Sequence, residues 1–228
     1  MQSRRSFDRL ASVYRTLEYL AFGHDLERAR FAHLERLREC RSILVLGEGD
    51  GRCLEQLVSA APHARIDCLD LSPAMLARAA RRLAGQTATD RVTFRQADLL
   101  AADLRPTHYD AVITFFFLDC FTATQAEFLM ARIQTSLRPA ALWLWADFDL
   151  PARGLARLRA RAWLAVLYAY FRWQTGLAAR ELPPVLRYFS ENNFEKITAI
   201  SLQWGLVRSE VWKRQSPPEH PDSSRLAS

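Results

Sequence analysis

The decisive stretch of this 228-residue sequence is Ile43-Leu44-Val45-Leu46-Gly47-Glu48-Gly49-Asp50-Gly51-Arg52. Four apolar residues rich in β-formers run straight into three glycines spaced two apart, and apolar residues then recur at helical spacing. This pattern predicts a buried strand, a tight turn and the start of a helix, which is the geometry of a nucleotide-binding crossover. Glycine suits such a turn because a side chain would hold a ligand away from the backbone N–H groups at the helix N-terminus.

Length and composition describe a chain that can bury a full core as one domain with some appendages. Half of the residues are hydrophobic, but no apolar run approaches the roughly 18 residues of a transmembrane helix. The N-terminal residues do not lead into an apolar signal-peptide core, so we expect a cytoplasmic protein. The four cysteines form no CxxC pair and have no histidine at metal spacing, which predicts core residues and no metal site. The net charge of +6 is mild, so we expect no nucleic-acid partner.

Strand-like and helix-like segments alternate on both sides of the glycine turn. Helical periodicity predicts two helices within residues 7–39, divided at Gly23 and His24. Ser72-Pro73 has the residue types of an N-cap and first helical position, so a helix should begin there. A further helix is expected from Thr122 to Leu137, closed by Arg138-Pro139, and a short one after Pro183-Pro184. The expected strands are 43–46, 65–71, 92–94, 109–117 and 141–148, followed by a hairpin of 197–204 and 206–212.

This alternation predicts the fold class α/β, with a Rossmann-like, doubly wound and mainly parallel seven-stranded sheet that ends in an antiparallel hairpin. Residues 1–40 are expected to form a helical N-terminal lid. Residues 41–213 should form the Rossmann-like domain, with a helical insertion at about 151–183. Residues 214–228 are polar and proline-containing, so we expect a disordered tail.

The spacing of the glycines excludes two common nucleotide sites. A dinucleotide fingerprint needs a third glycine where this chain has Arg52 or Leu54, and no G-K-[ST] of a P-loop is present. Asp70 lies 19 residues beyond Gly51 at the end of the second strand, the distance needed to reach the hydroxyls of a ribose on the glycine turn. Asp98 ends the third strand on the same edge, where an adenine amino group could donate to it.

The sequence resembles the class I S-adenosylmethionine-dependent methyltransferases over roughly residues 7–213. The resemblance rests on the glycine turn and on Cys68-Leu69-Asp70-Leu71-Ser72-Pro73-Ala74-Met75-Leu76, Gln96-Ala97-Asp98-Leu99 and Tyr109-Asp110-Ala111-Val112-Ile113. It implies that the cofactor is S-adenosyl-L-methionine, with its methionine part on the glycines, its ribose on Asp70 and its adenine beside Asp98 and Leu99. The loop from Phe115 would border the reacting methyl group. The cofactor-binding residues that we expect are Tyr14, Gly47, Glu48, Gly49, Gly51, Asp70, Leu71, Asp98, Leu99 and Phe115.

Within that class the layout is similar to the ubiquinone/menaquinone biosynthesis-type methyltransferases. Residues 7–14, Phe-Asp-Arg-Leu-Ala-Ser-Val-Tyr, resemble the N-terminal segment that folds over the cofactor in those enzymes, and an aromatic block at 163–173 recurs in them. One position departs from the family pattern. The family usually has an acidic residue two positions before the first glycine, to meet the methionine amino group, and this chain has Val45. Glu48 or a water molecule is the alternative source of that contact.

Methyl transfer from a sulfonium needs alignment and exclusion of water more than it needs a fixed set of catalytic residues, so we assign no catalytic residue. Asp119, Asp147 and His24 are candidate bases. Strand alternation places Phe115 and Phe117 on one face and Phe116 on the other, in an aromatic site for a small, hydrophobic or aromatic acceptor methylated at carbon or oxygen.

Three further points stay open from the sequence. Residues 153–173 start with arginines and continue apolar, which suits weak peripheral contact with an anionic membrane. The alternative functions are an RNA- or protein-directed methyltransferase and a non-catalytic binding protein of the same fold. Many amino-directed methyltransferases have the signature N/D-P-P-Y/F after strand four. This chain has Phe115-Phe116-Phe117-Leu118-Asp119 there, which speaks against the first alternative. The oligomeric state cannot be derived from these patterns.

Overall fold

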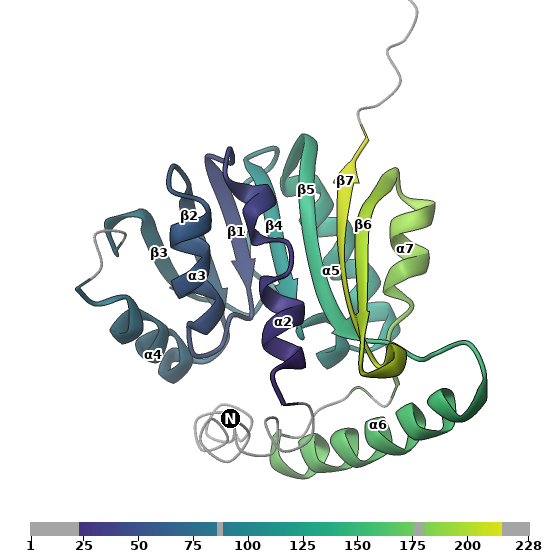
Figure 1. Cartoon of the computed structure of the whole chain (residues 1–228). Coiled ribbons are helices and arrows are strands. Elements are labelled where there is room, and N and C mark those ends of the chain that lie inside the picture. Colours follow the sequence, from purple (N-terminus) through teal and green to yellow (C-terminus); the bar gives the residue numbers. More distant parts are fainter. Residues whose placement is uncertain (1–22, 86–88, 176–178, 180, 216–228) are drawn as a thin grey trace, which may run out of the picture.

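The computed structural model describes residues 23–85, 89–175, 179 and 181–215, with the backbone alone at 170–175. A seven-stranded sheet with the order β3-β2-β1-β4-β5-β7-β6 runs through its centre (Figure 1). The strands are β1 (Ser42–Leu46), β2 (Arg65–Asp70), β3 (Val92–Gln96), β4 (Tyr109–Phe115), β5 (Leu137–Phe148), β6 (Phe194–Leu202) and β7 (Val207–Arg214). The helices are α2 (Asp25–Phe31), α3 (Arg52–Ala60), α4 (Pro73–Leu83), α5 (Ala123–Ser136), α6 (Gly154–Thr175) and α7 (Val185–Glu191).

The connections make this a doubly wound sheet with a C-terminal hairpin, as the sequence predicts. The first five strands pair in parallel, whereas β7 is antiparallel to both β5 and β6. The chain moves outward from β1 to β3 and then returns to place β4 on the other side of β1. The carboxyl ends of β1 and β4 therefore form the switch point at which ligands bind in folds of this type.

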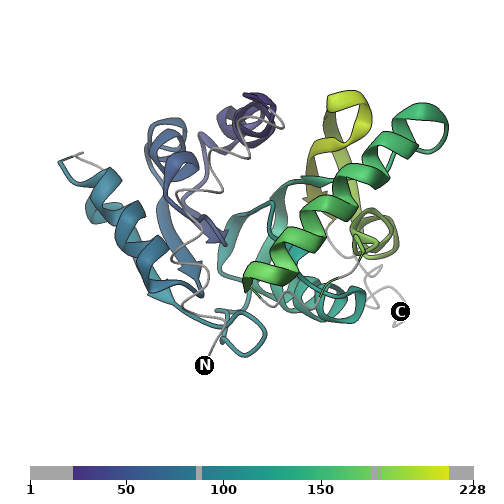
Figure 2. The same cartoon turned by 90° about the horizontal axis from the view of Figure 1, so that it is seen from below.

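Two hydrophobic clusters lie on opposite faces of the sheet. One contains the inward faces of α2, α3 and α4, together with Val45 and Ile113 from the central strands. The other contains α5 and α7 with Leu44, Val112 and the fully buried Trp143. The long helix α6 crosses below the carboxyl ends of the strands (Figures 1 and 2). Its buried residues Leu164 and Tyr168 join the first cluster.

The predicted helix starts are confirmed in atomic detail. The Ser72 side chain accepts a hydrogen bond from Met75 N at 3.2 Å, with Pro73 in the first helical turn. Thr122 and Gln125 form a reciprocal capping box at the start of α5. These caps satisfy backbone N–H groups that would otherwise lack partners at a helix N-terminus. None of the helices in the described residues is long and apolar enough to cross a membrane.

Several predicted boundaries are wrong: β4 ends at Phe115, and the hairpin strands are β6 (Phe194–Leu202) and β7 (Val207–Arg214) in place of 197–204 and 206–212. Two further differences have a physical reason. Arg138 and Pro139 do not follow α5 as a loop but lie inside β5, which begins at Leu137 directly after the helix. The strand tolerates the proline because its register against β4 is irregular there and Ala140 takes a positive φ of 61°.

The second N-terminal helix is also shorter than expected. α2 ends at Phe31, and a 3₁₀ turn at Leu34–Leu37 follows buried His33. The His33 ring forms a hydrogen bond with the Ser209 backbone, and burial lowers the pKa of His33. The first expected helix and most of the proposed lid and tail lie outside the described residues.

Candidate active site

The glycine turn joins β1 to α3 at the switch point of the sheet. Gly47 and Gly51 have positive φ values of 67° and 87°. A Cβ on Gly51 would lie 2.6 Å from Ala79 Cα, and a Cβ on Gly47 would lie 2.3 Å from a ring carbon of Phe117. Both positions therefore need glycine because neighbouring atoms approach the backbone closely. A Cβ on Gly49 would meet nothing within 4 Å, so the middle of the turn has room for a ligand.

Asp70 holds the end of β2 beside this turn. Its Oδ2 accepts a hydrogen bond from Gly49 N at 3.2 Å, and its Oδ1 accepts one from Ser72 N at 2.8 Å. Burial raises the pKa of Asp70, and the two amide bonds oppose this rise. The structure thus brings together the glycine turn and the acidic residue that the sequence places 19 positions later.

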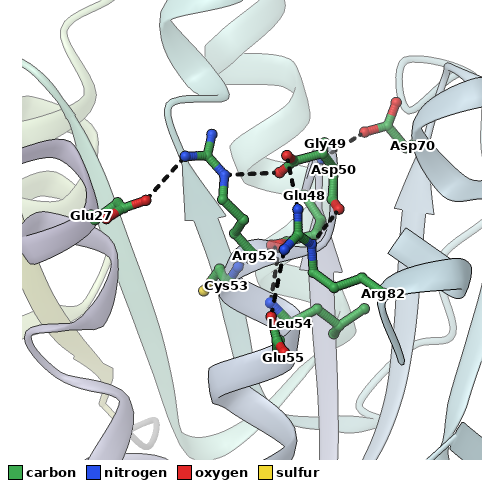
Figure 3. Close-up of polar contacts among 10 residues, drawn as sticks. All are labelled: Glu27, Glu48, Gly49, Asp50, Arg52, Cys53, Leu54, Glu55, Asp70 and Arg82. Atoms are coloured by element: carbon green, nitrogen blue, oxygen red, sulfur yellow. Dashed lines mark hydrogen bonds and ion pairs between the residues drawn. The ribbon is translucent and has the colours of Figure 1, made fainter. Parts of the chain in front are cut away.

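Glu48 caps helix α3 from inside the turn. Its Oε1 accepts hydrogen bonds from Cys53 N at 2.9 Å and Leu54 N at 3.0 Å (Figure 3). Burial raises the pKa of Glu48 to about 7, although these two bonds and the nearby Arg30 favour the charged form. Val45 has its side chain in the core, where it is only 1% exposed. Glu48 therefore has a structural role in this conformation, in addition to the predicted contact with a ligand.

A network of ion pairs fixes the outer side of the turn (Figure 3). Asp50 binds Arg52 Nε at 3.1 Å and Arg82 Nη2 at 3.4 Å. Arg52 also reaches Glu27 of α2 at 3.1 Å. Glu27 in turn lies 3.5 Å from the exposed candidate base His24. The sequence reasoning missed this network because its members come from α2, the turn and α4, with no local spacing that connects them.

The remaining predicted cofactor residues lie at neighbouring strand ends, with one exception. Asp98 is exposed just after β3, and its Oδ1 accepts a hydrogen bond from Leu100 N at 3.0 Å. Leu99, the next residue, is buried. Leu71 follows β2, and its carbonyl accepts a hydrogen bond from the Gln96 side chain at 3.3 Å. Tyr14 lies outside the described residues.

The aromatic run after β4 has a different arrangement from the one expected. The prediction that Phe115 and Phe117 share a face is wrong, because β4 ends at Phe115 and Phe116 takes a positive φ of 51°. Phe115 and Phe116 pack into the α2–α4 cluster, whereas Phe117 packs into the α5–α7 cluster. The Arg30 guanidinium lies 4.8 Å from the centre of the Phe116 ring. Alternation fails because it applies only while the chain remains a strand.

Two candidate bases, Asp119 and Asp147, meet at the ends of β4 and β5. Asp147 is 2% exposed, and its Oδ2 accepts a hydrogen bond from Asp119 N at 3.2 Å. The Tyr168 hydroxyl of α6 donates to the Asp119 carbonyl at 3.3 Å. Burial raises the pKa of Asp119 to about 6. Burial and then the charge of Asp119 raise the pKa of Asp147 well above its usual range. The two carboxyl groups therefore titrate as a coupled pair, and both hold their protons to a higher pH than ordinary aspartates do.

Beneath the pair, two buried polar atoms have no hydrogen-bond partner of normal geometry among the described residues: Trp145 Nε1 and Glu210 Oε2. The two residues stand opposite each other on β5 and β7. The Trp145 indole favours the ionised form of Asp147. The other Glu210 oxygen accepts a hydrogen bond from Arg208 Nε at 2.6 Å. Nothing in the local sequence signals this cluster, because long-range pairing of β5 with β7 creates it.

Comparisons with known proteins agree with this architecture. Residues 43–140 match the family model of a methyltransferase domain. Trans-aconitate 2-methyltransferase of Methylobacterium nodulans is 38% identical over 91 residues, which make up 39% of this chain and 33% of that protein. The match therefore spans only about a third of the length of that curated relative.

Two solved structures have the same fold at low sequence identity. N-methyltransferase NodS from Bradyrhizobium japonicum, in complex with S-adenosyl-L-homocysteine, has a TM-score of 0.66 and 17% identity, over 95% of this chain and 100% of that chain. An O-methyltransferase family protein from Burkholderia thailandensis has a TM-score of 0.68 and 16% identity, over 93% of this chain and 60% of that chain.

These findings confirm the resemblance to the class I S-adenosylmethionine-dependent methyltransferases. They support this class in general, and none of them singles out the ubiquinone/menaquinone type.

Proposed function

We propose that the protein uses S-adenosyl-L-methionine to methylate a small acceptor, hydrophobic or aromatic in character, at carbon or oxygen. The observation that carries this proposal is the pairing of the glycine turn with Asp70. Gly49 N lies 3.2 Å from Asp70 Oδ2, and both groups stand at the carboxyl ends of neighbouring parallel strands. Switch-point turns of this kind place backbone N–H groups and one carboxylate around an adenosine-type ligand.

The residues present fit this cofactor. The open side of Gly49 leaves space at the middle of the turn. Each Asp70 oxygen accepts one backbone N–H in this structure, and each keeps a second lone pair for a ribose hydroxyl. Asp98 and Leu99 would flank the adenine, and Leu71 and Phe115 would close the sides. Tyr14 and Glu48 remain in the proposed set. When bound, the cofactor would supply a methyl group already activated by a positively charged sulfur.

We assign the acceptor to the side of the site formed by β4, β5 and α6. The rings of half-buried Phe116 and buried Phe148 pack edge to face there, with their centroids 5.4 Å apart, and this apolar surrounding suits an aromatic or hydrophobic molecule. The Asp119–Asp147 pair is the polar group on this side. With the pKa of Asp119 raised to about 6, its carboxylate is ionised at neutral pH and can accept a proton from an acceptor hydroxyl.

Formation of S-adenosylhomocysteine tests the class of acceptor. Mass spectrometry would follow this product after the protein is mixed with S-adenosylmethionine and a small-molecule extract, a total RNA fraction or a protein fraction. Turnover with the small-molecule extract alone supports the proposal. Turnover only with RNA or protein would favour a macromolecular acceptor. Cofactor binding without any turnover would favour the non-catalytic alternative.

The first acceptor identified then tests the carboxyl pair. Asp119→Asn should reduce the rate for a hydroxyl acceptor by about 10²–10⁴-fold, with cofactor affinity unchanged. The wild-type rate should rise with pH through about 6, and the variant should lose this rise. Asp103→Asn is the matched control because Asp103 is fully exposed. A variant with the wild-type rate would remove Asp119 from the mechanism.

A further inference from the structure

Helix α6 has an exposed apolar face in addition to the face that packs on the site. Leu155 is 84% exposed, Leu158 is 67% exposed and Val166 is 61% exposed. Three alanines between and beyond them are exposed too, so the α6 outer face comprises Leu155, Leu158, Ala162, Ala165, Val166 and Ala169. At helical spacing these six side chains cover a continuous arc of about 100°. An ordinary surface helix would carry charged residues on such an arc.

Arginines border this apolar arc. Arg159 and Arg161 lie on opposite sides of it by helical spacing, and Arg153 and Arg157 precede them. The sequence contains no Asp or Glu between Leu150 and Arg180. The charges next to the apolar arc are therefore of one sign, and they have no acidic partner within the helix itself.

A strained turn adds an exposed indole beside this helix. Trp204 is 76% exposed and takes a positive φ of 57° in the turn between β6 and β7. The Arg159 guanidinium lies 4.8 Å from the centre of its ring and also donates to Gln203 Oε1 at 2.9 Å. The next residue, Gly205, approaches Pro151, which precedes α6. The turn and the start of α6 are thus held together.

We propose that the α6 outer face, with Trp204, docks on the surface of an anionic lipid membrane. A helix that lies in the membrane plane binds through three kinds of side chain. Here leucines would enter the headgroup region, a neighbouring tryptophan would lie at the interface, and arginines would reach lipid phosphates. This inference does not depend on the proposed chemistry.

Charge distinguishes a lipid surface from a second copy of the chain. A symmetric dimer would place the α6 outer face against itself. It would then bring the arginines of both copies together with no acidic residue on α6 to neutralise them. An anionic membrane supplies the missing negative charge along the whole arc. The opposite face of the same helix contacts the site through Tyr168, so docking would place the acceptor side near the lipid.

Co-sedimentation with vesicles tests the proposal on the full chain. We expect binding to vesicles of phosphatidylcholine mixed with phosphatidylglycerol, weak binding to phosphatidylcholine alone, and a loss of binding as salt increases. Leu155→Ser/Leu158→Ser should weaken binding by about 10–100-fold, because two large apolar side chains no longer enter the lipid. Phe128→Ser is the matched control, since Phe128 is 52% exposed on α5, and it should bind as the wild type does.

Two double substitutions of arginine isolate the electrostatic contribution to vesicle binding. Arg159→Gln/Arg161→Gln should lower binding by about 30-fold, at about 1 kcal/mol per arginine. Arg36→Gln/Arg38→Gln has the same net charge but changes exposed residues before β1, at the other edge of the sheet, and should have little effect. Equal binding by the leucine variant and the wild type would overturn the proposal. Dimers in light scattering that the leucine variant abolishes, without vesicle binding, would also overturn it by assigning the face to a second copy.

Discussion

The proposed cofactor side and the proposed acceptor side of this site are built in different ways. On the cofactor side, the turn after β1 is held by backbone hydrogen bonds and close backbone approach, and both Asp70 oxygens accept backbone N–H groups. On the acceptor side, Asp119, Asp147 and Tyr168 come from three distant segments. Two buried polar atoms near them, Trp145 Nε1 and Glu210 Oε2, have no hydrogen-bond partner of normal geometry among the described residues.

The difference separates a rigid half from an adaptable half. Backbone geometry allows few substitutions on the cofactor side, since one added methyl group would collide with a neighbouring helix. The acceptor side depends on side chains from distant segments, which bond to the Asp119 backbone, so its shape and charge can vary while the fold stays the same.

The largest effect is expected from Gly51→Ala. The new Cβ would lie 2.6 Å from Ala79 Cα, at a φ of 87°, so we expect a loss of about 2–4 kcal/mol in the free energy of unfolding. Gly49→Ala is the control because its φ of 73° is similar but the space around it is open. It should cost only about 1 kcal/mol. Urea denaturation measures both, and equal losses would show that the close approach to α4 does not restrict the turn.

Glu48→Gln should change how stability depends on pH. Burial raises the folded-state pKa of Glu48 from 4.5 to about 7. Between these values the folded chain keeps a proton that the unfolded chain releases, so the free energy of unfolding falls as pH rises. From pH 5 to pH 8 the wild type should lose roughly 2–3 kcal/mol more than the variant. Parallel pH profiles from chemical denaturation would contradict the burial of this carboxylate.

Asp70→Ala should weaken S-adenosylmethionine binding by about 1–3 kcal/mol, because hydrogen bonds to an ionised group would be lost. The exposed Asp103→Ala is the control and should bind as the wild type does. Calorimetric titration of both variants measures the difference. Unchanged affinity in Asp70→Ala would remove this residue from the cofactor side.

Tyr168→Phe gives the smallest expected effect. It removes one hydrogen bond, from the hydroxyl to the Asp119 carbonyl at 3.3 Å, and should lower the free energy of unfolding by about 0.5–1.5 kcal/mol. Tyr188→Phe, which removes a 2.8 Å bond to Gln134 between α7 and α5, is the matched control. A loss well above that of the control would show that the acceptor side is as firmly fixed as the turn.

The same contrast explains what the sequence could predict. Some features depend on local periodicity and on the rule that parallel strands share a carboxyl edge. They are the sheet, the caps at Ser72 and Thr122, and the juxtaposition of the glycine turn with Asp70. These features could be predicted. Pro139 inside β5 could not be, because a register irregularity against β4 makes it tolerable.

Long-range packing decided the remaining features. The positive φ of Phe116 reverses the expected faces of the aromatic run. The contact of Arg52 with Glu27 spans 25 positions, and that of Asp119 with Asp147 spans 28. No spacing rule connects such pairs before the sheet is assembled. The acceptor side was therefore visible in the sequence only as separate candidate residues.

The most direct test of the central claim is isothermal titration of the wild-type protein with S-adenosyl-L-methionine. We predict saturable binding of one cofactor per chain, with S-adenosylhomocysteine competing for the same site. A folded protein, verified by circular dichroism, that binds neither compound would contradict the account.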